Sequence, residues 1–298
     1  MKTLPRLGLG TWKSEPGKVG AAVTHAITNC GYRHIDSAAI YGNEKEIGEA
    51  LSKLFTTKTI TREELFVTSK LWNNMHKKER VRMACEKTLK DLQLDYLDLY
   101  LMHWGVAMPE SGQSFDEEGL LVTEKTSIRE TWEAMEELVD AGLVRSIGVA
   151  NFTAPMLLDL LSYARVLPAM NQIELHPYIQ QPELVQFCTE RGIQVTAYSP
   201  LGSRGNTEKR GLPSPLDDAT IISLAKQHNK TPAQIALRWA IQRKTIPIPK
   251  SVTPKRIKEN YDVYDFELSE SDMQAIRQID KNMRFIDPSL WWKIPYFN

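Results

Sequence analysis

Residues 65–103 read LFVTSKLWNNMHKKERVRMACEKTLKDLQLDYLDLYLMH. Both ends of this stretch, residues 65–70 and 96–103, are short apolar runs that suit strands buried on both faces of a parallel sheet. Residues 77–91 lie between them and have the apolar spacing of a helix. The stretch therefore predicts one strand, one helix and a second, parallel strand.

The same alternation continues through most of the chain. Further apolar runs of strand length lie at residues 32–36, 144–150, 169–175, 194–199, 245–249 and 262–266. Further helical patterns lie near residues 17–29, 43–54, 126–141, 153–161, 180–190, 217–242 (with an expected break) and 253–260. Eight strands alternating with eight helical segments predict an α/β fold of the (β/α)8, or TIM, barrel type, formed by a single domain over residues 1–298. A doubly wound sheet is the alternative, because alternation alone does not show that a sheet closes.

Three segments fall outside the repeat. Residues 4–12 are expected to form an N-terminal hairpin before the barrel. Residues 105–125 form a long polar loop after the third predicted strand. A final helix near residues 270–279 leads to a C-terminal tail from Asp280 that is rich in aromatic residues. Because barrel active sites lie at the C-terminal ends of the strands, this loop and tail are expected to wall a substrate pocket.

Composition limits the class of protein. The 298 residues are 42% hydrophobic and 25% charged, with a formal net charge of zero, so we expect neither nucleic-acid nor anionic-membrane binding. The sequence contains no run of 18 uncharged apolar residues and no apolar leader, so we expect no membrane span and no secretion signal. Three cysteines without CxxC spacing fit a reducing compartment. We expect a cytoplasmic monomer.

The ends of the predicted strands carry chemically active residues. The first strand ends at Asp36, with Tyr41 shortly after it, and the next two end at Lys70 and His103. A phenol has a pKa of about 10, but a nearby ammonium favours the phenolate, and a carboxylate keeps that ammonium charged. Each residue alone also fits a structural ion pair or simple packing. Together at one barrel mouth, they favour a proton-transfer site.

Other catalytic motifs are missing from the sequence. Gly8-Leu-Gly10 begins a dinucleotide fingerprint, but Lys13 occupies the position of its third glycine. The six histidines have no paired ligand spacing, so we expect no metal site. No GxSxG nucleophile motif occurs.

Residues 246–260, IPIPKSVTPKRIKEN, run from the seventh predicted strand into a helix. Lys250, Thr253 and Arg256 lie near the N-terminus of that helix, which favours binding of a phosphate. Arginine adds bidentate phosphate contacts. An ordinary capped helix with a solvated basic face is the alternative, but this fold often has a phosphate site after strands seven and eight.

Several motifs in order resemble those of the aldo-keto reductase superfamily, most closely its aldose and aldehyde reductase branch. The resemblance extends from Gly8-Leu-Gly-Thr-Trp12 to Phe266-Glu-Leu268. Between these ends it includes residues 32–38, 41–44, 69–72, 99–104, 171–174, 198–202 and 248–253.

The catalytic tetrad of that superfamily falls on Asp36, Tyr41, Lys70 and His103. The resemblance implies that a nicotinamide delivers hydride to a carbonyl carbon while Tyr41 protonates the carbonyl oxygen. It also implies that Lys70, held by Asp36, lowers the pKa of Tyr41, and that His103 orients the carbonyl. Steroid double-bond reductases of the family carry Glu at the position of His103, so carbonyl reduction is favoured.

The resemblance implies NADPH/NADP+ as the cofactor. Tyr198 would stack on the nicotinamide, and Asn151 and Gln172 would bond its carboxamide. Lys250 and Arg256 favour NADPH over NADH, because a phosphate-binding cluster gains nothing from a 2′-hydroxyl. The residues expected to contact the cofactor are Thr11, Trp12, Lys13, Asp36, Asn151, Gln172, Tyr198, Ser199, Leu201 and Ser203, then Lys250, Ser251, Val252, Thr253 and Arg256 towards the 2′-phosphate, and Glu259 and Asn260 at the adenine.

The chain departs from the family pattern at three places. Ala150 replaces a serine that usually bonds the carboxamide. Gly205 lies where aldose reductases have an acid that latches the cofactor through basic residues corresponding to Lys13 and Lys250, and Glu208 is the candidate replacement. The tail does not resemble the aldose reductase tail, so substrate preference does not carry over.

A small carbonyl compound is the expected substrate, in an aromatic pocket that suits aldehydes and moderately apolar ketones. The expected substrate contacts are Trp12, Ile40, Tyr41, Trp72, His103 and Trp104. Two other functions compete with this interpretation. Lys70 would be a Schiff-base nucleophile in a barrel aldolase, and a nucleotide-binding regulatory or structural protein would use the fold without turnover.

Overall fold

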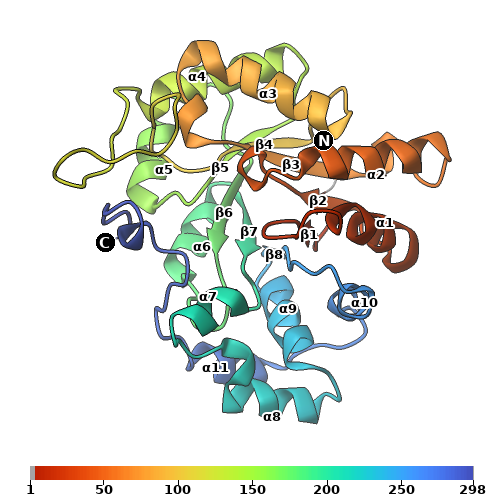
Figure 1. The fold of residues 1–298 in the computed structure, drawn as a ribbon. Coiled ribbons are helices and arrows are strands. Elements are labelled where there is room, and N and C mark those ends of the chain that lie inside the picture. Colours follow the sequence, from red (N-terminus) through yellow and green to blue (C-terminus); the bar gives the residue numbers. More distant parts are fainter. Residues whose placement is uncertain (1–3, 298) are drawn as a thin grey trace.

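The computed structural model describes residues 4–297, apart from the side chains of residues 204 and 206. Eight strands form one sheet in the sequential order β1 to β8, and each neighbouring pair is parallel. Figure 1 shows the strands at the centre, with helices arranged around them. The strands are β1 (Leu9–Gly10), β2 (His34–Asp36), β3 (Phe66–Leu71), β4 (Leu99–Met102), β5 (Ile147–Ala150), β6 (Met170–Glu174), β7 (Gln194–Tyr198) and β8 (Ile246–Pro247).

The sheet closes between its first and last strands. The Gly8 and Gly10 amides donate to the Pro247 and Pro249 carbonyls, at 3.0 and 3.1 Å. Prolines 247 and 249 accept hydrogen bonds at this seam but have no N–H to donate in return. A Cβ on Gly10 would lie 2.7 Å from the Ile248 carbonyl oxygen, so the close approach requires glycine there. The predicted barrel is confirmed, and the doubly wound alternative is wrong.

Two strand predictions near the ends of the chain are wrong. Residues 4–12 form no hairpin, because Leu9–Gly10 is itself the first barrel strand and pairs in parallel with β2. Residues 262–266 contain no strand. Val263 is fully buried, but its backbone carbonyl accepts a hydrogen bond from the Arg238 side chain rather than from a neighbouring strand. The apolar pattern there reflects burial among the outer helices, so the predicted first to seventh strands correspond to β2 to β8.

Each barrel strand from β2 to β7 is followed by a helix, and most helices match the predicted ranges. The helices are α1 (Val19–Cys30), α2 (Glu44–Thr56), α3 (Lys78–Leu92), α4 (Ile128–Asp140), α5 (Ala154–Leu161), α6 (Pro182–Glu190), α7 (Arg204–Lys209), α8 (Ala219–Gln227), α9 (Pro232–Gln242), α10 (Pro254–Tyr261) and α11 (Glu270–Arg277). The predicted break near residues 217–242 separates α8 from α9. Only α7, a short helix between β7 and α8, lacked a prediction. No helix within residues 4–297 is long and apolar enough to cross a membrane.

Apolar packing positions the two sides of the barrel mouth. Side chains alternate along a strand, so Phe66 and Lys70 of β3 share one face. Phe66 packs with Leu99 and Met170 in one apolar cluster, while a larger cluster fills the space between sheet and helices. A third cluster joins Trp104 to Trp292. The loop after β4 and the C-terminal tail therefore meet at the mouth, as predicted.

Candidate active site

A buried ion pair forms the floor of the site. The Lys70 ammonium lies 2.6 Å from Oδ1 of Asp36, and both side chains are buried. Lys70 also donates to the Ser37 carbonyl at 2.8 Å, and the Gln172 amide donates to Oδ2 of Asp36 at 2.7 Å. A buried charge is costly without such partners. The strands β2, β3 and β6 therefore supply a fully bonded cation beneath the mouth.

Tyr41 lies above this ion pair. It ends a 3-10 turn, Ala39–Tyr41, and Gly42 follows with a φ of 68°, a left-handed conformation that glycine adopts without strain. The Lys70 ammonium donates to the Tyr41 hydroxyl at 3.3 Å. Burial, followed by the charges of Asp36 and Glu44, raises the pKa of Tyr41 well above its ordinary value. Burial also lowers the pKa of Lys70, against the opposing effect of Asp36.

The direction of the Tyr41 shift is opposite to the prediction from the family resemblance. Lys70 is in contact with the phenol, but the loss of water around the hydroxyl and the charges of Asp36 and Glu44 raise the pKa of Tyr41. Tyr41 therefore keeps its proton through the neutral range. A proton donor needs that state before it acts.

His103 completes the group of four. Its ring lies 5.9 Å from the Tyr41 ring and 5.1 Å from the Trp72 ring, with edge-on geometry in both pairs. Burial, with a smaller effect of the Lys70 charge, holds the pKa of His103 well below its ordinary value. The imidazole is therefore neutral at neutral pH and carries one N–H that can donate to an oxygen. The structure thus brings all four predicted catalytic residues together.

Polar side chains from β5, β6 and β7 lie beside this group. The Tyr198 hydroxyl donates to Oδ1 of Asn151 at 2.7 Å, and the Asn151 amide donates to the His103 carbonyl at 2.9 Å. Asn151 has a φ of 65°, in the left-handed region. Ala150 is buried and offers no side-chain hydrogen bond. The predicted carboxamide contacts are therefore close to the tetrad, and Gln172 already bonds Asp36.

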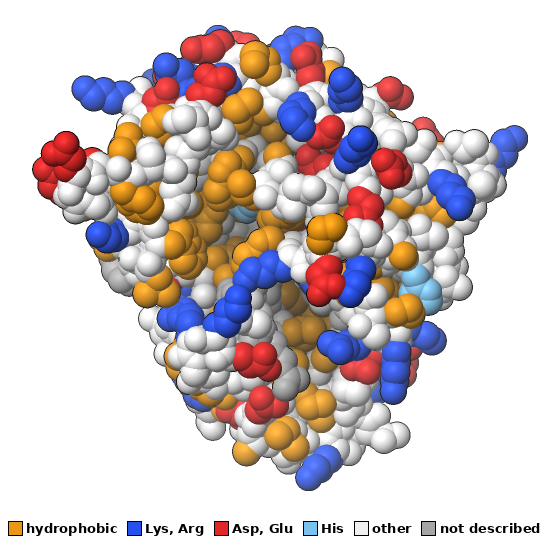
Figure 2. Space-filling model, in the orientation of Figure 1, with side chains coloured by type: hydrophobic (Ala, Val, Ile, Leu, Met, Phe, Trp, Pro, Cys, Tyr) orange, Lys and Arg blue, Asp and Glu red, His pale blue; other side chains and the backbone are white. Residues whose placement is uncertain are grey.

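A basic group borders the mouth on the β8 and β1 side. The Lys250 ammonium donates to the Lys13 carbonyl at 2.8 Å, and the Lys13 ammonium lies 4.4 Å from the centre of the Trp12 ring. Partial burial, then the charges of Lys209 and Lys250, lowers the pKa of Lys13. Figure 2 shows a hollow lined by hydrophobic side chains, with a His side chain inside it and Lys and Arg side chains beside it.

Most of the remaining predicted cofactor residues lie on the connections that follow β7 and β8 or in α10. Thr11 follows β1 instead, and its buried hydroxyl donates to the Asp36 carbonyl at 2.9 Å. Glu259 already accepts a hydrogen bond from the Thr231 hydroxyl at 2.9 Å, and Asn260 is buried. The β7–α7 connection carries Ser199, Leu201 and Ser203, and the β8–α10 connection and first turns of α10 carry Ser251, Val252, Thr253 and Arg256.

Aromatic side chains wall the hollow above the tetrad. Trp12 lies 6.5 Å from Tyr41, ring centre to ring centre, and Ile40 is 48% exposed at the rim. Two residues of the tail also belong to this wall, although the sequence predicted only the tail as a whole. Trp292 packs edge-on against Trp104 at 5.2 Å, and the Tyr296 hydroxyl accepts from the Gly105 amide at 2.9 Å. The aromatic richness of the tail was the available signal, but spacing alone does not show which ring turns inward.

A buried carboxyl group behind the tetrad was not predicted from the sequence. Glu44, the first residue of α2, accepts hydrogen bonds from the Ser69 hydroxyl at 2.5 Å and the Thr88 hydroxyl at 3.0 Å. Burial raises the pKa of Glu44, against the effect of these two bonds. Because Ser69 precedes Lys70 on β3, this network holds β3 against α2 and α3 next to the ion pair.

The chain is a closed parallel barrel. At its strand ends lie a buried acid, amine, phenol and imidazole, an arrangement that places it in the class of α/β-barrel enzymes. The chain belongs to the aldo/keto reductase family, whose sequence model matches residues 6–281. Family membership makes it an oxidoreductase and implies NAD(P)H-dependent carbonyl reduction.

Individual relatives agree with this assignment. Aldo-keto reductase family 1 member A1 of Sus scrofa is 52% identical over 291 residues, covering 96% of this chain and 89% of the relative. The human protein of the same name is 50% identical over the same length, with the same coverage. The solved structure of aldose reductase from Giardia lamblia matches with a TM-score of 0.92 at 43% identity, covering all of both chains. That of aldose reductase from Schistosoma japonicum matches with a TM-score of 0.91 at 43% identity, covering 99% of this chain and 95% of that one.

Proposed function

We propose that this protein reduces aldehydes and ketones to alcohols with NADPH, and that Tyr41 is the proton donor. The observation that carries the proposal is the contact between the Tyr41 hydroxyl and the buried Lys70–Asp36 pair, next to a neutral His103 and an apolar hollow. When bound, NADPH supplies the hydride for the carbonyl carbon.

Tyr41 supplies the proton. As the carbonyl carbon is reduced, negative charge develops on the oxygen, and an alkoxide is a stronger base than a phenolate. The raised pKa of Tyr41 therefore does not prevent transfer of its proton to that oxygen. The Lys70 ammonium, 3.3 Å from the hydroxyl, stabilises the phenolate left behind. Asp36 keeps Lys70 charged despite its burial.

His103 orients the carbonyl. Its neutral imidazole donates one hydrogen bond to the carbonyl oxygen and does not compete with Tyr41 as an acid. Its edge-on contacts with Tyr41 and Trp72 limit rotation of the ring. The oxygen is thus placed between two donors, one that releases its proton and one that retains it.

The residues near the basic group fit NADPH. Lys250 and Arg256 lie where the β8–α10 loop meets the N-terminus of α10, and within the part of the chain that the structure describes Arg256 forms no ion pair. A 2′-phosphate would neutralise part of this positive charge, whereas a 2′-hydroxyl would not. Asn151 and Gln172 would bond the carboxamide, and Tyr198 would stack on the nicotinamide ring. Gln172 would do so while retaining its bond to Asp36.

The walls of the hollow favour substrates with apolar bodies. Trp72, Trp104 and Trp292 surround the space next to His103, and the indole N–H of Trp292 is already bonded to Gln113 at 3.1 Å. Such a wall offers area to aryl and alkyl groups and few hydrogen bonds to sugar hydroxyls. We therefore place aromatic and medium-chain aldehydes ahead of polyhydroxylated ones as substrates.

The test follows NADPH absorbance with a panel of aldehydes. We expect turnover by the wild type and a loss of about 10²- to 10⁴-fold in kcat for Tyr41→Phe, with NADPH binding unchanged. Full activity of Tyr41→Phe would contradict the mechanism. Tight NADPH binding without turnover of any aldehyde would instead support a regulatory protein. Borohydride trapping of a substrate on Lys70 would support an aldolase, although its bonds to Asp36 and Ser37 disfavour a free amine.

A further inference from the structure

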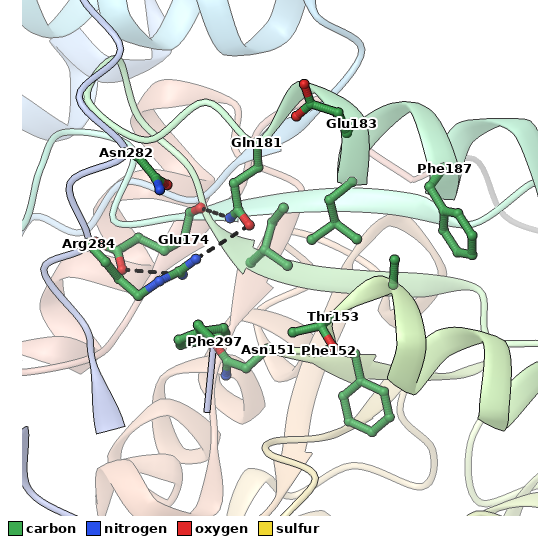
Figure 3. Close-up of a pocket in the computed structure, with 13 residues that line it drawn as sticks. Asn151, Phe152, Thr153, Glu174, Gln181, Glu183, Phe187, Asn282, Arg284 and Phe297 are labelled. Carbon is green, nitrogen blue, oxygen red and sulfur yellow. Dashed lines mark hydrogen bonds and ion pairs between the residues drawn. The ribbon is translucent and has the colours of Figure 1, made fainter. Parts of the chain in front are cut away.

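A cavity of about 450 Å³ lies beside the barrel mouth, between the ends of β5 and β6, helix α6 and the C-terminal tail. Its volume is within the range of sites that bind small molecules. None of the four tetrad residues lines it, and among the predicted cofactor residues only Asn151 does. Figure 3 shows Arg284 and Asn282 on the tail side and Phe187 on α6 at the opposite side.

Arg284 supplies a positive charge to one end of the cavity. The neighbouring carboxylate, Glu174, is fully buried and already accepts hydrogen bonds from the Phe285 and Ile286 amides at 2.7 and 3.0 Å. His176 Nε2 lies 3.1 Å from the same carboxylate. The guanidinium of Arg284 stays 3.9 Å from Glu174, so it is an electrostatic neighbour rather than a hydrogen-bonded partner.

The donors of Arg284 are largely unused. Within residues 4–297 its side chain makes one hydrogen bond, a long one of 3.5 Å to Gln181, although a guanidinium has five N–H donors. The Phe297 ring lies 3.7 Å from the guanidinium carbon. The side chain is only 15% exposed, so its charge faces the cavity rather than open solvent. A planar anion such as a carboxylate fits these donors.

The rest of the cavity is largely apolar. Figure 3 shows Phe152 and Phe187 away from Arg284, and Leu184 and Ile173 also line the cavity. Glu183, exposed in the first turn of α6, adds a negative charge at the rim. That charge would repel a second anionic group on a ligand. The cavity thus combines an end where the Arg284 guanidinium lies beside the buried Glu174 carboxylate, an apolar body and an acidic rim.

We propose that this cavity is a second small-molecule site, which binds a monocarboxylate with an aryl or alkyl body. The carboxylate lies on Arg284, and the apolar body packs against Phe152 and Phe187. A dicarboxylate binds less well because of Glu183, and a neutral alcohol of the same shape leaves the Arg284 donors unmatched. The site is separate from the carbonyl pocket and does not depend on the proposed reduction.

The cavity shares one wall with the active site. Phe297 contacts Arg284 on one side, and its ring centre lies 6.0 Å from that of Trp104 on the other. Asn151, at the inner end of the cavity, accepts the hydrogen bond from Tyr198. A bound carboxylate therefore touches residues that reach the carbonyl pocket, and Trp104 fluorescence would report its binding.

The test measures binding of 4-phenylbutyrate to the protein by calorimetry, without NADPH or aldehyde. We expect one molecule per chain, and at least about ten-fold weaker binding of 4-phenyl-1-butanol. Arg284→Met is expected to weaken binding of 4-phenylbutyrate by a similar factor. Leu184→Trp, which fills the cavity and leaves the charge in place, is expected to do the same. Arg277→Met on α11 and Leu158→Trp on α5, both at exposed positions, are the matched controls.

Two results would overturn the proposal. One is binding by Arg284→Met and Leu184→Trp that equals that of the wild type. The other is loss of binding in Trp72→Ala but not in Leu184→Trp, because the carboxylate would then lie in the carbonyl pocket. Leu184→Trp keeps the test valid if loss of Arg284 disturbs the tail. Since no turnover is measured, failure here leaves the proposed reductase function unaffected.

Discussion

The tetrad and the basic group at the two sides of the barrel mouth are built in different ways. Asp36 and Lys70 are buried, in hydrogen-bond contact and further bonded to Ser37 and Gln172. Lys13 and Lys250 are partly exposed, and partial burial and nearby positive charges lower the pKa of each. The first side is complete before any ligand arrives. The second concentrates positive charge that a bound phosphate would partly neutralise, so variants should affect folding on one side and ligand affinity on the other.

The largest effect is expected for Lys70→Met. Loss of the ammonium leaves the Asp36 carboxylate buried without its partner, so the free energy of unfolding should fall by about 3–5 kcal/mol. Aldehyde turnover should fall by at least about 10²-fold, because nothing then stabilises the Tyr41 phenolate. Denaturant unfolding and NADPH-linked assays measure the two effects. The double variant Asp36→Asn with Lys70→Met should recover stability but not activity. A double variant as unstable as Lys70→Met would show that the unpaired Asp36 carboxylate is not the cause.

Acidification should lower the stability of the barrel next, through three buried histidines. Burial lowers the pKa of His34 to about 4, and the pKa values of His76 and His103 also lie below their ordinary value. Below about pH 6.5 the unfolded chain binds protons that the folded chain does not, so stability is complete above that pH and is lost as pH falls. Each histidine contributes a slope of up to about 1.4 kcal/mol per pH unit, which for His34 ends near pH 4.

Unfolding measured between pH 7 and pH 4 checks this dependence. The variant His76→Asn should lower the slope by the contribution of one histidine, because burial lowers the pKa of His76. An equal slope in wild type and His76→Asn would assign the acid sensitivity to other groups.

On the basic side, Arg256→Leu should weaken NADPH binding by about 10- to 100-fold, since a charged hydrogen bond contributes about 1.5–3 kcal/mol. NADH binding should barely change, and neither should the free energy of unfolding, because Arg256 is exposed. Fluorescence titration with both nucleotides measures the difference, with Lys226→Leu on α8 as the control. Equal losses for NADPH and NADH would place Arg256 away from the 2′-phosphate.

The smallest effect concerns the missing acid at Gly205. A Cβ there would meet no other atom within 4 Å, so Gly205→Asp is sterically permitted. An added carboxylate near Lys13 and Lys250 should slow NADPH release by about 2- to 5-fold, the range of a surface ion pair. Stopped-flow fluorescence measures the rate, and Gly205→Asn provides the uncharged control. If the asparagine variant slows release equally, charge does not explain the effect.

Sequence reasoning found the tetrad because the physics of that side is local to strand ends. A short apolar run followed at once by a polar residue identifies Asp36, Lys70 and His103, and the barrel rule places them together. It failed for β1 because Leu9–Gly10 is only two residues long and lies among glycines and a proline. At Val263 it predicted a strand that does not exist, because burial against helices produces the same apolar pattern as a strand.

The contacts that sequence reasoning missed join distant parts of the chain. Glu174 bonds the Phe285 amide 111 positions away, and Trp292 bonds Gln113 179 positions away. Glu44 and Thr88 are 44 positions apart. No periodic pattern encodes such pairs, because they depend on how the tail and helices are placed around the finished barrel. The sequence therefore predicted that the tail reaches the barrel mouth, but not its individual contacts or the cavity beside it.

The seam between β8 and β1 has a consequence for the slow opening motions of the barrel. Because Pro247 and Pro249 cannot donate, this junction has fewer hydrogen bonds than an ordinary parallel pair, and local opening should begin there. Lys13 follows one edge of the seam and Lys250 the other, so the proposed NADPH would contact both edges. Amide hydrogen exchange at Gly8 and Gly10 should therefore slow as NADPH is added, in proportion to its occupancy. The cofactor would then be a structural component of the barrel as well as its reductant.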